Sequence, residues 1–182
     1  ALAIFKNRFR SRSEVLTLFA AASLPIFAWA IALIVVYAPQ YILRLNLWDT
    51  VGVVAYVLAY ALLETLIVFA IVMVILLLLP ARWHSSKTVP LTAAYLMLTT
   101  VLVVFLNVAE EKAIVRGKFT ETFIALAVYV LLIILTTVVI RRSDRITRLF
   151  SSVLERFVPL VFLYSFIALV GAVIVAFRNL AA

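Results

Sequence analysis

Long apolar runs separated by short polar segments make up most of the sequence. Glu64 is the only Asp, Glu, Lys, Arg or His residue within these runs. A helix of about 20 apolar residues crosses the ~30 Å hydrocarbon core of a lipid bilayer. The pattern therefore predicts an all-α polytopic membrane protein, a bundle of five transmembrane helices within one membrane domain, residues 15–180. The predicted spans are residues 15–37, 51–79, 89–109, 122–140 and 157–177.

Polar residues ahead of several runs predict where the helices begin. Ser, Thr, Asp and Asn are favoured at this position because their side-chain oxygens accept hydrogen bonds from the free amides of the first turn. The candidate caps are Ser11 with Glu14, Asp49 or Thr50, Thr88 followed by Pro90, and Thr120.

Residues 143–156 form a connection of a different kind. Their apolar residues recur at intervals of three and four, while their Arg and Glu residues lie toward the opposite side. This spacing predicts an amphipathic interfacial helix that lies in the headgroup layer with its basic side toward water. The candidates for contact with anionic lipid headgroups are Arg141, Arg142, Arg145 and Arg148. Anchoring of the topology alone explains the same arginines, so both alternatives remain.

The basic residues are divided unequally between the two ends of the predicted spans. If the spans alternate across the membrane, eleven Lys and Arg residues lie on the side of the basic tail, residues 1–14, and five lie on the other side. Lys and Arg are enriched in cytoplasmic segments. We therefore expect a cytoplasmic N-terminus and an extracytoplasmic C-terminus, in the plasma (inner) membrane of a bacterium.

Composition excludes several classes of function. The net charge of +8 comes from segments that flank the spans, which is the distribution of a membrane protein and not of a nucleic-acid-binding one. The chain has no Cys, and its one His, His84, follows Trp83 at the expected inner interface, where we expect an anchoring role. The spans hold no Ser–His pair, no pair of acidic residues and no Gly-rich phosphate loop. We therefore expect no enzymatic activity, cofactor or metal in this chain.

Glu64 is the residue in the spans with the most distinctive chemistry. A carboxyl group at mid-depth costs a few kcal/mol, so it must be protonated or must face protein or water. Tyr60 lies one turn earlier on the same face, and hydroxyls at a similar depth come from Ser23, Thr99, Thr100 and Ser165. A neutral Glu64 that hydrogen-bonds a neighbouring helix is one interpretation, and a proton or cation relay through these hydroxyls is the other.

The last predicted span carries a stripe of small residues, Ala168, Ala172 and Ala176. Small residues four positions apart let helix backbones approach closely in membranes, so we expect this stripe to be a helix-packing face.

The chain also shows a resemblance to a known family. In three features the chain resembles the membrane region of the lipoteichoic acid synthase and sulfatase-like family. These are the five spans, the sequence Arg178-Asn179-Leu180 just past the last span, and Asn107 with Gly117-Lys118-Phe119 before the fourth span. In that family such a region precedes an extracellular metal-dependent hydrolase or transferase domain. The resemblance implies a membrane anchor with a C-terminal domain beyond this sequence, and none of the family's catalytic or metal-binding residues has a counterpart here.

Three functional hypotheses follow from the sequence. The first is a non-catalytic membrane subunit or anchor that packs against partner subunits or lipid. The second is the membrane anchor region of an extracytoplasmic sulfatase- or phosphotransferase-like enzyme, and the third is a proton- or cation-translocating unit that uses Glu64. A bilayer, other membrane subunits or a further C-terminal domain are the expected partners, and nucleic acid is not.

Overall fold

A computed structural model describes residues 12–78, 87–116 and 120–180, without the side chains of residues 108–116 and 121. Each of its helices is long and apolar enough to cross a membrane. The prediction of an all-α fold with five helices that are long and apolar enough to span a membrane is therefore confirmed, and this supports the prediction of contact with a lipid bilayer. The helices are α2 (Arg12–Arg44), α3 (Leu47–Leu78), α4 (Thr88–Arg116), α5 (Thr120–Arg142) and α6 (Asp144–Leu180).

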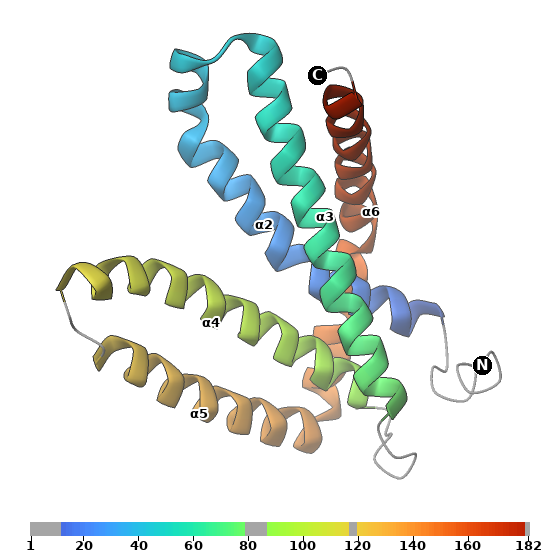
Figure 1. Cartoon of the computed structure of the whole chain (residues 1–182). Coiled ribbons are helices and arrows are strands. Elements are labelled where there is room, and N and C mark those ends of the chain that lie inside the picture. The colour runs from blue at the N-terminus through green and yellow to red at the C-terminus, as the bar shows by residue number, and fades with distance from the viewer. Residues whose placement is uncertain (1–11, 79–86, 117–119, 181–182) are drawn as a thin grey trace.

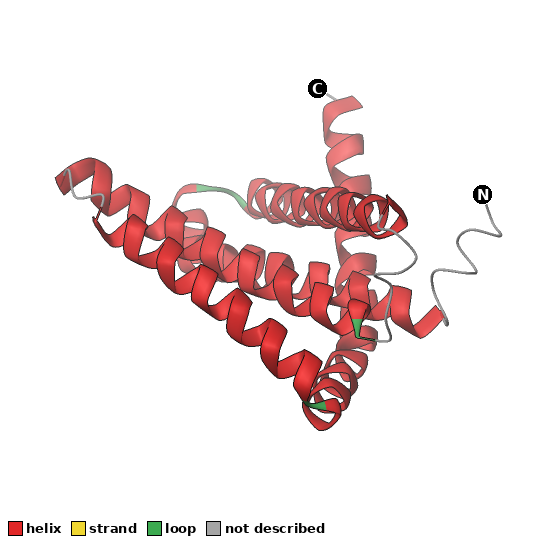
Figure 2. Cartoon of the chain, turned by 90° about the horizontal axis from the view of Figure 1, so that it is seen from below, coloured by secondary structure: helices red, strands yellow, loops and turns green. Residues whose placement is uncertain are grey.

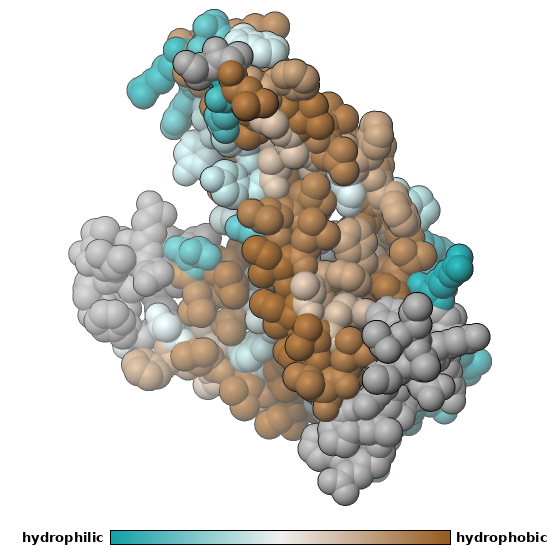
Figure 3. All heavy atoms as spheres, turned by 45° about the vertical axis from the view of Figure 1, so that its right-hand side comes forward, coloured by the Kyte–Doolittle hydropathy of each residue, from teal (hydrophilic) through white to brown (hydrophobic). Residues whose placement is uncertain are grey.

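The helices form two groups (Figure 1). α2, α3 and α6 pack together, while α4 and α5 run side by side as a hairpin that extends away from them, as the view from below also shows (Figure 2). Among the described residues, most of the surface visible in Figure 3 is apolar. Such an exterior suits contact with lipid, because no large apolar surface of this kind is stable in water.

The described helices pack around two buried clusters. One joins the first turns of α2 and α4 to the end of α3 and to Leu154 of α6. The other lies between α2, α3 and α6, where the ring of Phe27 stacks on Tyr164 with centroids 5.9 Å apart. Leu18 in the first cluster and Phe27 in the second are among the largest fully buried side chains, so each makes many van der Waals contacts.

α3 and α6 approach most closely at small residues. A Cβ atom added to Gly171 would lie 3.1 Å from the carbonyl oxygen of Ala55, which leaves no room for a larger side chain. Of the alanine stripe, the structure buries Ala168 completely, half-buries Ala172 and leaves Ala176 exposed. The packed face therefore turns from Ala168 toward Gly171, which the four-residue spacing did not include.

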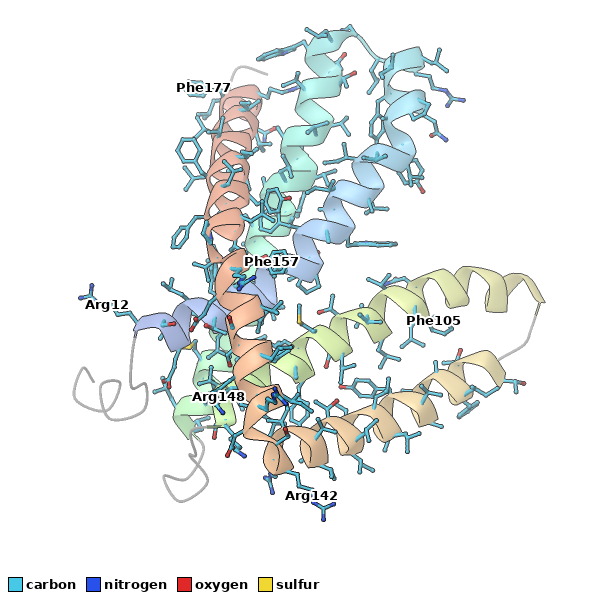
Figure 4. All side chains as sticks on the ribbon, turned by 180° about the vertical axis from the view of Figure 1, so that it is seen from behind. Arg12, Phe105, Arg142, Arg148, Phe157 and Phe177 are labelled. Carbon is cyan, nitrogen blue, oxygen red and sulfur yellow. The ribbon has the colours of Figure 1, made fainter. Side chains whose placement is uncertain are left out.

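The expected interfacial helix is not a separate element of the structure. Residues 144–156 are helical, but they continue through Pro159 into the last span as one helix, Asp144–Leu180. A helix can pass through proline at the cost of one backbone hydrogen bond and a bend, and no Gly or Asn interrupts the sequence there. Figure 4 shows the ribbon of α6 turning near Phe157.

The turn between α5 and α6 is very short, because only Ser143 separates the two helices. The Ser143 hydroxyl accepts a hydrogen bond from the amide of Ile146, 3.3 Å away, and thus caps α6. Thr147 is buried and donates to the carbonyl of Ile140, 3.0 Å away on α5. These contacts fix the first turn of α6 against the end of α5.

The start signals are matched in part. Thr88 and Thr120 are the first residues of α4 and α5. The expected cap at Asp49 or Thr50 is wrong, because α3 begins at Leu47 and the amide of Asp49 donates to the side chain of Asn46, 2.7 Å away. Asn46 was missed because a cap was expected directly before the long apolar run, and Asn46 lies several residues earlier, before Leu47 and Trp48. Several sequence predictions lie outside the described residues. They are the cap at Ser11, most of the basic tail, the end of the second span, Trp83 with His84, and Gly117-Lys118-Phe119.

Candidate functional site

Glu64 lies near the middle of α3 on the face that points away from the rest of the chain. Its side chain is exposed, and it has no hydrogen-bond or ion-pair partner within the part of the chain that the structure describes. Tyr60 on the same face is 62% exposed, and Ile67 and Ile71 continue this face at about half exposure. We call these four residues the α3 outer face.

The hydroxyls expected around Glu64 are not brought to it. Ser23 donates to the carbonyl of Phe19, 2.7 Å away, and Thr100 donates to the carbonyl of Leu96, 2.9 Å away. Both bonds stay within one helix, which is a common solution for Ser and Thr in helix interiors. The hydroxyl of Ser165 is buried and has no partner among the described residues.

Thr99 belongs instead to a ladder of hydroxyls between α4 and α5. Its hydroxyl lies 2.9 Å from the hydroxyl of Tyr129, and the hydroxyl of Tyr95 lies 2.6 Å from the hydroxyl of Thr137. These two pairs join the helices of the hairpin, because each gives a polar group a partner away from water. An apolar groove of about 430 Å³ lies further along the hairpin, between Leu102 and other apolar side chains of both helices.

A polar cluster ties the end of α6 to the start of α3. The guanidinium of Arg178 donates to the Asp49 carboxylate, 2.8 Å away, and to the carbonyl of Trp48, 3.0 Å away. It also lies 6.0 Å from the centroid of the Trp48 ring. Gly52 leaves space for this side chain, since a Cβ added there would overlap the guanidinium of Arg178. We call this set of residues the α3–α6 clamp; the sequence did not predict it.

We expect Arg178→Ala to lower the free energy of unfolding by about 1 kcal/mol, because it removes a partly exposed ion pair and a cation–π contact together. Thermal unfolding of the purified chain in detergent, followed by circular dichroism, measures the change. Arg142→Ala is the matched control: this side chain is exposed and has no ion pair in the described region, so its effect should stay within about 0.5 kcal/mol. Equal effects of the two changes would contradict the clamp.

A second polar cluster lies at the opposite end of α6. Lys87 pairs with the Asp144 carboxylate at 2.5 Å and donates to the carbonyl of Arg141 at 2.8 Å. Lys87 lowers the pKa of the Asp144 carboxyl, which precedes the apolar part of α6. The hydrogen bond from Lys87 is the larger cause, and the positive charge of Lys87 is the second. Ser13 of α2 donates to Glu155, 2.9 Å away. These contacts join α2, α4 and α5 to α6 at one end of the molecule.

The arginines expected to face lipid headgroups belong to this same end. Arg141, Arg142, Arg145 and Arg148 are all exposed. Figure 4 shows Arg142 and Arg148 at one end of the molecule and Phe177 near the other. At 1.5 Å per residue, the rise along α6 from Glu155 to Arg178 is about 35 Å, close to the ~30 Å of a hydrocarbon core. The two polar clusters are therefore separated by about the thickness of the hydrocarbon core of a bilayer.

Neither a cluster of possible metal ligands nor a similarity to known proteins identifies a functional site in the described residues. Among the described residues, no group of three His, Cys, Asp or Glu side chains gathers closely enough to hold a metal ion. Comparison of the chain with family models, curated proteins and solved structures finds no match.

Proposed function

We propose that this chain is a non-catalytic integral membrane subunit that binds a transmembrane helix of another protein on the α3 outer face. The observation that carries the proposal is Glu64, exposed near the middle of a span and without a partner in the described residues. In hydrocarbon no water replaces a missing hydrogen-bond partner, so an uncovered carboxyl group costs a few kcal/mol. A helix that covers it removes this cost.

The chemistry of the partner follows from what the spans lack. The predicted spans of this chain contain no Lys, Arg or His, so a cation for Glu64 must come from another chain. We therefore expect a partner helix that carries Lys or Arg at the depth of Glu64. Tyr60, one turn away and exposed, supplies a second hydroxyl for the same interface.

The orientation belongs to the same proposal. The eleven basic residues on the side of the N-terminal tail, against five on the other side, support a cytoplasmic N-terminus in a bacterial plasma membrane. The end of α6 with the α3–α6 clamp then faces the outside. The alternative of a membrane region of a lipoteichoic acid synthase or sulfatase-like enzyme is supported by the five-span topology alone, and the proton or cation relay remains a prediction.

Photo-crosslinking tests the partner. With benzoylphenylalanine in place of Ile67, we expect a specific adduct with another membrane protein, mapped to a transmembrane segment that contains Lys or Arg. Glu64→Leu should reduce this adduct about fivefold, because an interhelical hydrogen bond in a membrane is worth about 1 kcal/mol. Glu64→Gln keeps the shape and an acceptor oxygen for the Lys or Arg but removes the negative charge, so it should reduce the adduct less than Glu64→Leu does.

The matched control carries the same photoreactive residue at Leu135 of α5, which is 55% exposed but has no carboxyl group beside it. Lipid adducts alone at both positions would overturn the proposal, and so would an adduct with a second copy of this chain. A Glu64→Gln variant that folds and assembles normally but loses a proton or ion flux would favour the relay instead.

A further inference from the structure

We propose that a polar groove beside the first turns of α6 binds the headgroup of a lipid with a phosphodiester and a primary ammonium group, as in phosphatidylethanolamine. The groove has a volume of about 480 Å³ and lies between Lys87, just ahead of α4, and the segment of α6 from Asp144 to Glu155. It belongs to the polar end of the molecule described above, and the proposal does not depend on the partner of Glu64.

The α6 side of the groove carries charges of both signs in a fixed order. Arg148, Ser151, Ser152 and Glu155 all line it, and their spacing of three and four residues places them on one face of the helix. A cation therefore stands at one end of this face and a carboxylate at the other, with two hydroxyls between them.

The charges of Arg148 and Glu155 are the ones left for a ligand. Lys87 and Asp144 neutralise each other, since their side chains form an ion pair. Arg148 and Glu155 form no ion pair with any residue in the described ranges. Arg148 donates through Nε to the carbonyl of Asp144, 3.4 Å away in its own helix, so its two terminal nitrogens are the ones that can reach a ligand. Glu155 accepts one hydrogen bond, from Ser13, and a carboxylate has room for further donors.

A phosphodiester followed by a short link to an ammonium group matches this order. Arginine and serine side chains donate hydrogen bonds to phosphate oxygens, so the phosphate belongs at Arg148 and the two serines. Glu155 lies about one helical turn, ~5.4 Å, beyond Ser151 and Ser152. The two-carbon link of ethanolamine is short enough to place its ammonium beside that carboxylate.

Other lipid headgroups fit less well. A choline group has no N–H to donate and is recognised mainly by aromatic faces, but no aromatic side chain of the described residues lines this groove. An anionic headgroup such as glycerol phosphate would satisfy Arg148 but would leave Glu155 without a cation. The groove therefore selects the primary ammonium through Glu155.

The position of the groove favours a lipid over a soluble molecule. Phe162 follows Glu155 by seven residues, about two turns further along the same face of α6, and it is exposed within the apolar part of the helix. A lipid whose headgroup occupies the groove can place its acyl chains along this apolar surface, as a soluble headgroup cannot.

Native mass spectrometry of the full chain in detergent, with lipids of identical acyl chains, tests the proposal. The probes are phosphatidylethanolamine, its mono- and dimethylated forms, phosphatidylcholine and phosphatidylglycerol. We expect about tenfold stronger retention of phosphatidylethanolamine than of phosphatidylcholine, with a stepwise fall as methyl groups replace N–H donors, because hydrogen bonds to charged groups are strong. Equal retention across the methylation series would overturn the proposal.

Variants assign the two ends of the headgroup. Glu155→Gln should abolish the preference for phosphatidylethanolamine over phosphatidylcholine, whereas Ser13→Ala, which keeps the carboxylate, should retain it. Arg148→Gln should weaken binding of both lipids about equally, and Arg145→Gln, an exposed arginine that does not line the groove, should weaken neither.

Two further results would overturn the assignment. One is a methylation series that falls as steeply in Glu155→Gln as in the original chain. The other is equal displacement of the lipid by water-soluble glycerophosphoethanolamine, which would assign the groove to a soluble ligand. If a variant does not fold, the methylation series on the unmodified chain still decides the outcome.

Discussion

Replacing Gly171 by Leu is expected to lower the free energy of unfolding by about 3 kcal/mol, the upper part of the usual range for overpacking a close contact. The Cβ of any new side chain would lie 3.1 Å from the carbonyl oxygen and 3.4 Å from the Cα of Ala55. These are backbone atoms of α3, so they cannot rotate away. Leu at this position must therefore push α6 and α3 apart and loosen their shared contacts.

Chemical unfolding of the purified chain in detergent measures this change. Gly171→Ala is expected to have a small effect, because the tight contact of one methyl group is partly offset by the better helix propensity of Ala. Ala176→Leu adds a large side chain on the same helix at an exposed position, and it should change stability by less than about 0.5 kcal/mol. A Gly171→Leu variant as stable as Ala176→Leu would show that α3 and α6 do not approach here.

The second large effect concerns topology, and we expect it to be nearly all-or-none. The chain has no Cys, so a single cysteine introduced at Arg145 or at Leu180 is labelled without a background signal from other thiols of the chain. Both positions are exposed and lie toward opposite ends of α6. Because the basic residues favour a cytoplasmic N-terminus, an impermeant thiol reagent added to intact cells should label Leu180→Cys and leave Arg145→Cys unlabelled.

Permeabilised cells supply the control, since both cysteines should then react to the same extent. Labelling of both positions in intact cells would contradict the prediction that α6 crosses the membrane. Labelling of Arg145→Cys alone would reverse the proposed orientation.

The end clusters bear on how the chain is held in a bilayer. Arg178 with Asp49 at one end and Lys87 with Asp144 at the other are ion pairs at the surface of the protein. Such pairs are weak in water, so their contribution to stability is modest. Their separation by about the thickness of a hydrocarbon core nevertheless gives α6 a fixed depth, because moving either pair into lipid would remove charged groups from water.

The sequence was informative about Glu64 in one respect and misleading in another. It identified Glu64 as the one charged residue within the spans, because a lone carboxyl group among apolar residues is visible without knowledge of the fold. It also suggested that Ser23 and Thr100 gather around Glu64 at equal depth. In the structure their hydroxyls bond to carbonyls one turn earlier in their own helices. Equal depth does not imply contact, since the rotation of each helix about its axis decides which side chains meet.

The number and the helical state of the candidate spans were determined by the sequence itself, whereas the lengths of the helices were not, since α6 includes the segment predicted to be a separate interfacial helix. The number and the helical state each depend on a property of one continuous segment, a run of apolar residues long enough to cross the bilayer, and lipid forces such a segment to satisfy its backbone hydrogen bonds as a helix. The faces of the helices were decided only by the tertiary structure. A membrane helix is apolar toward lipid and toward its neighbours alike, so no periodic pattern marks its inner side. The close approach at Gly171, the outward position of Glu64 and the reach of Arg178 across Gly52 therefore depend on how whole helices pack against one another.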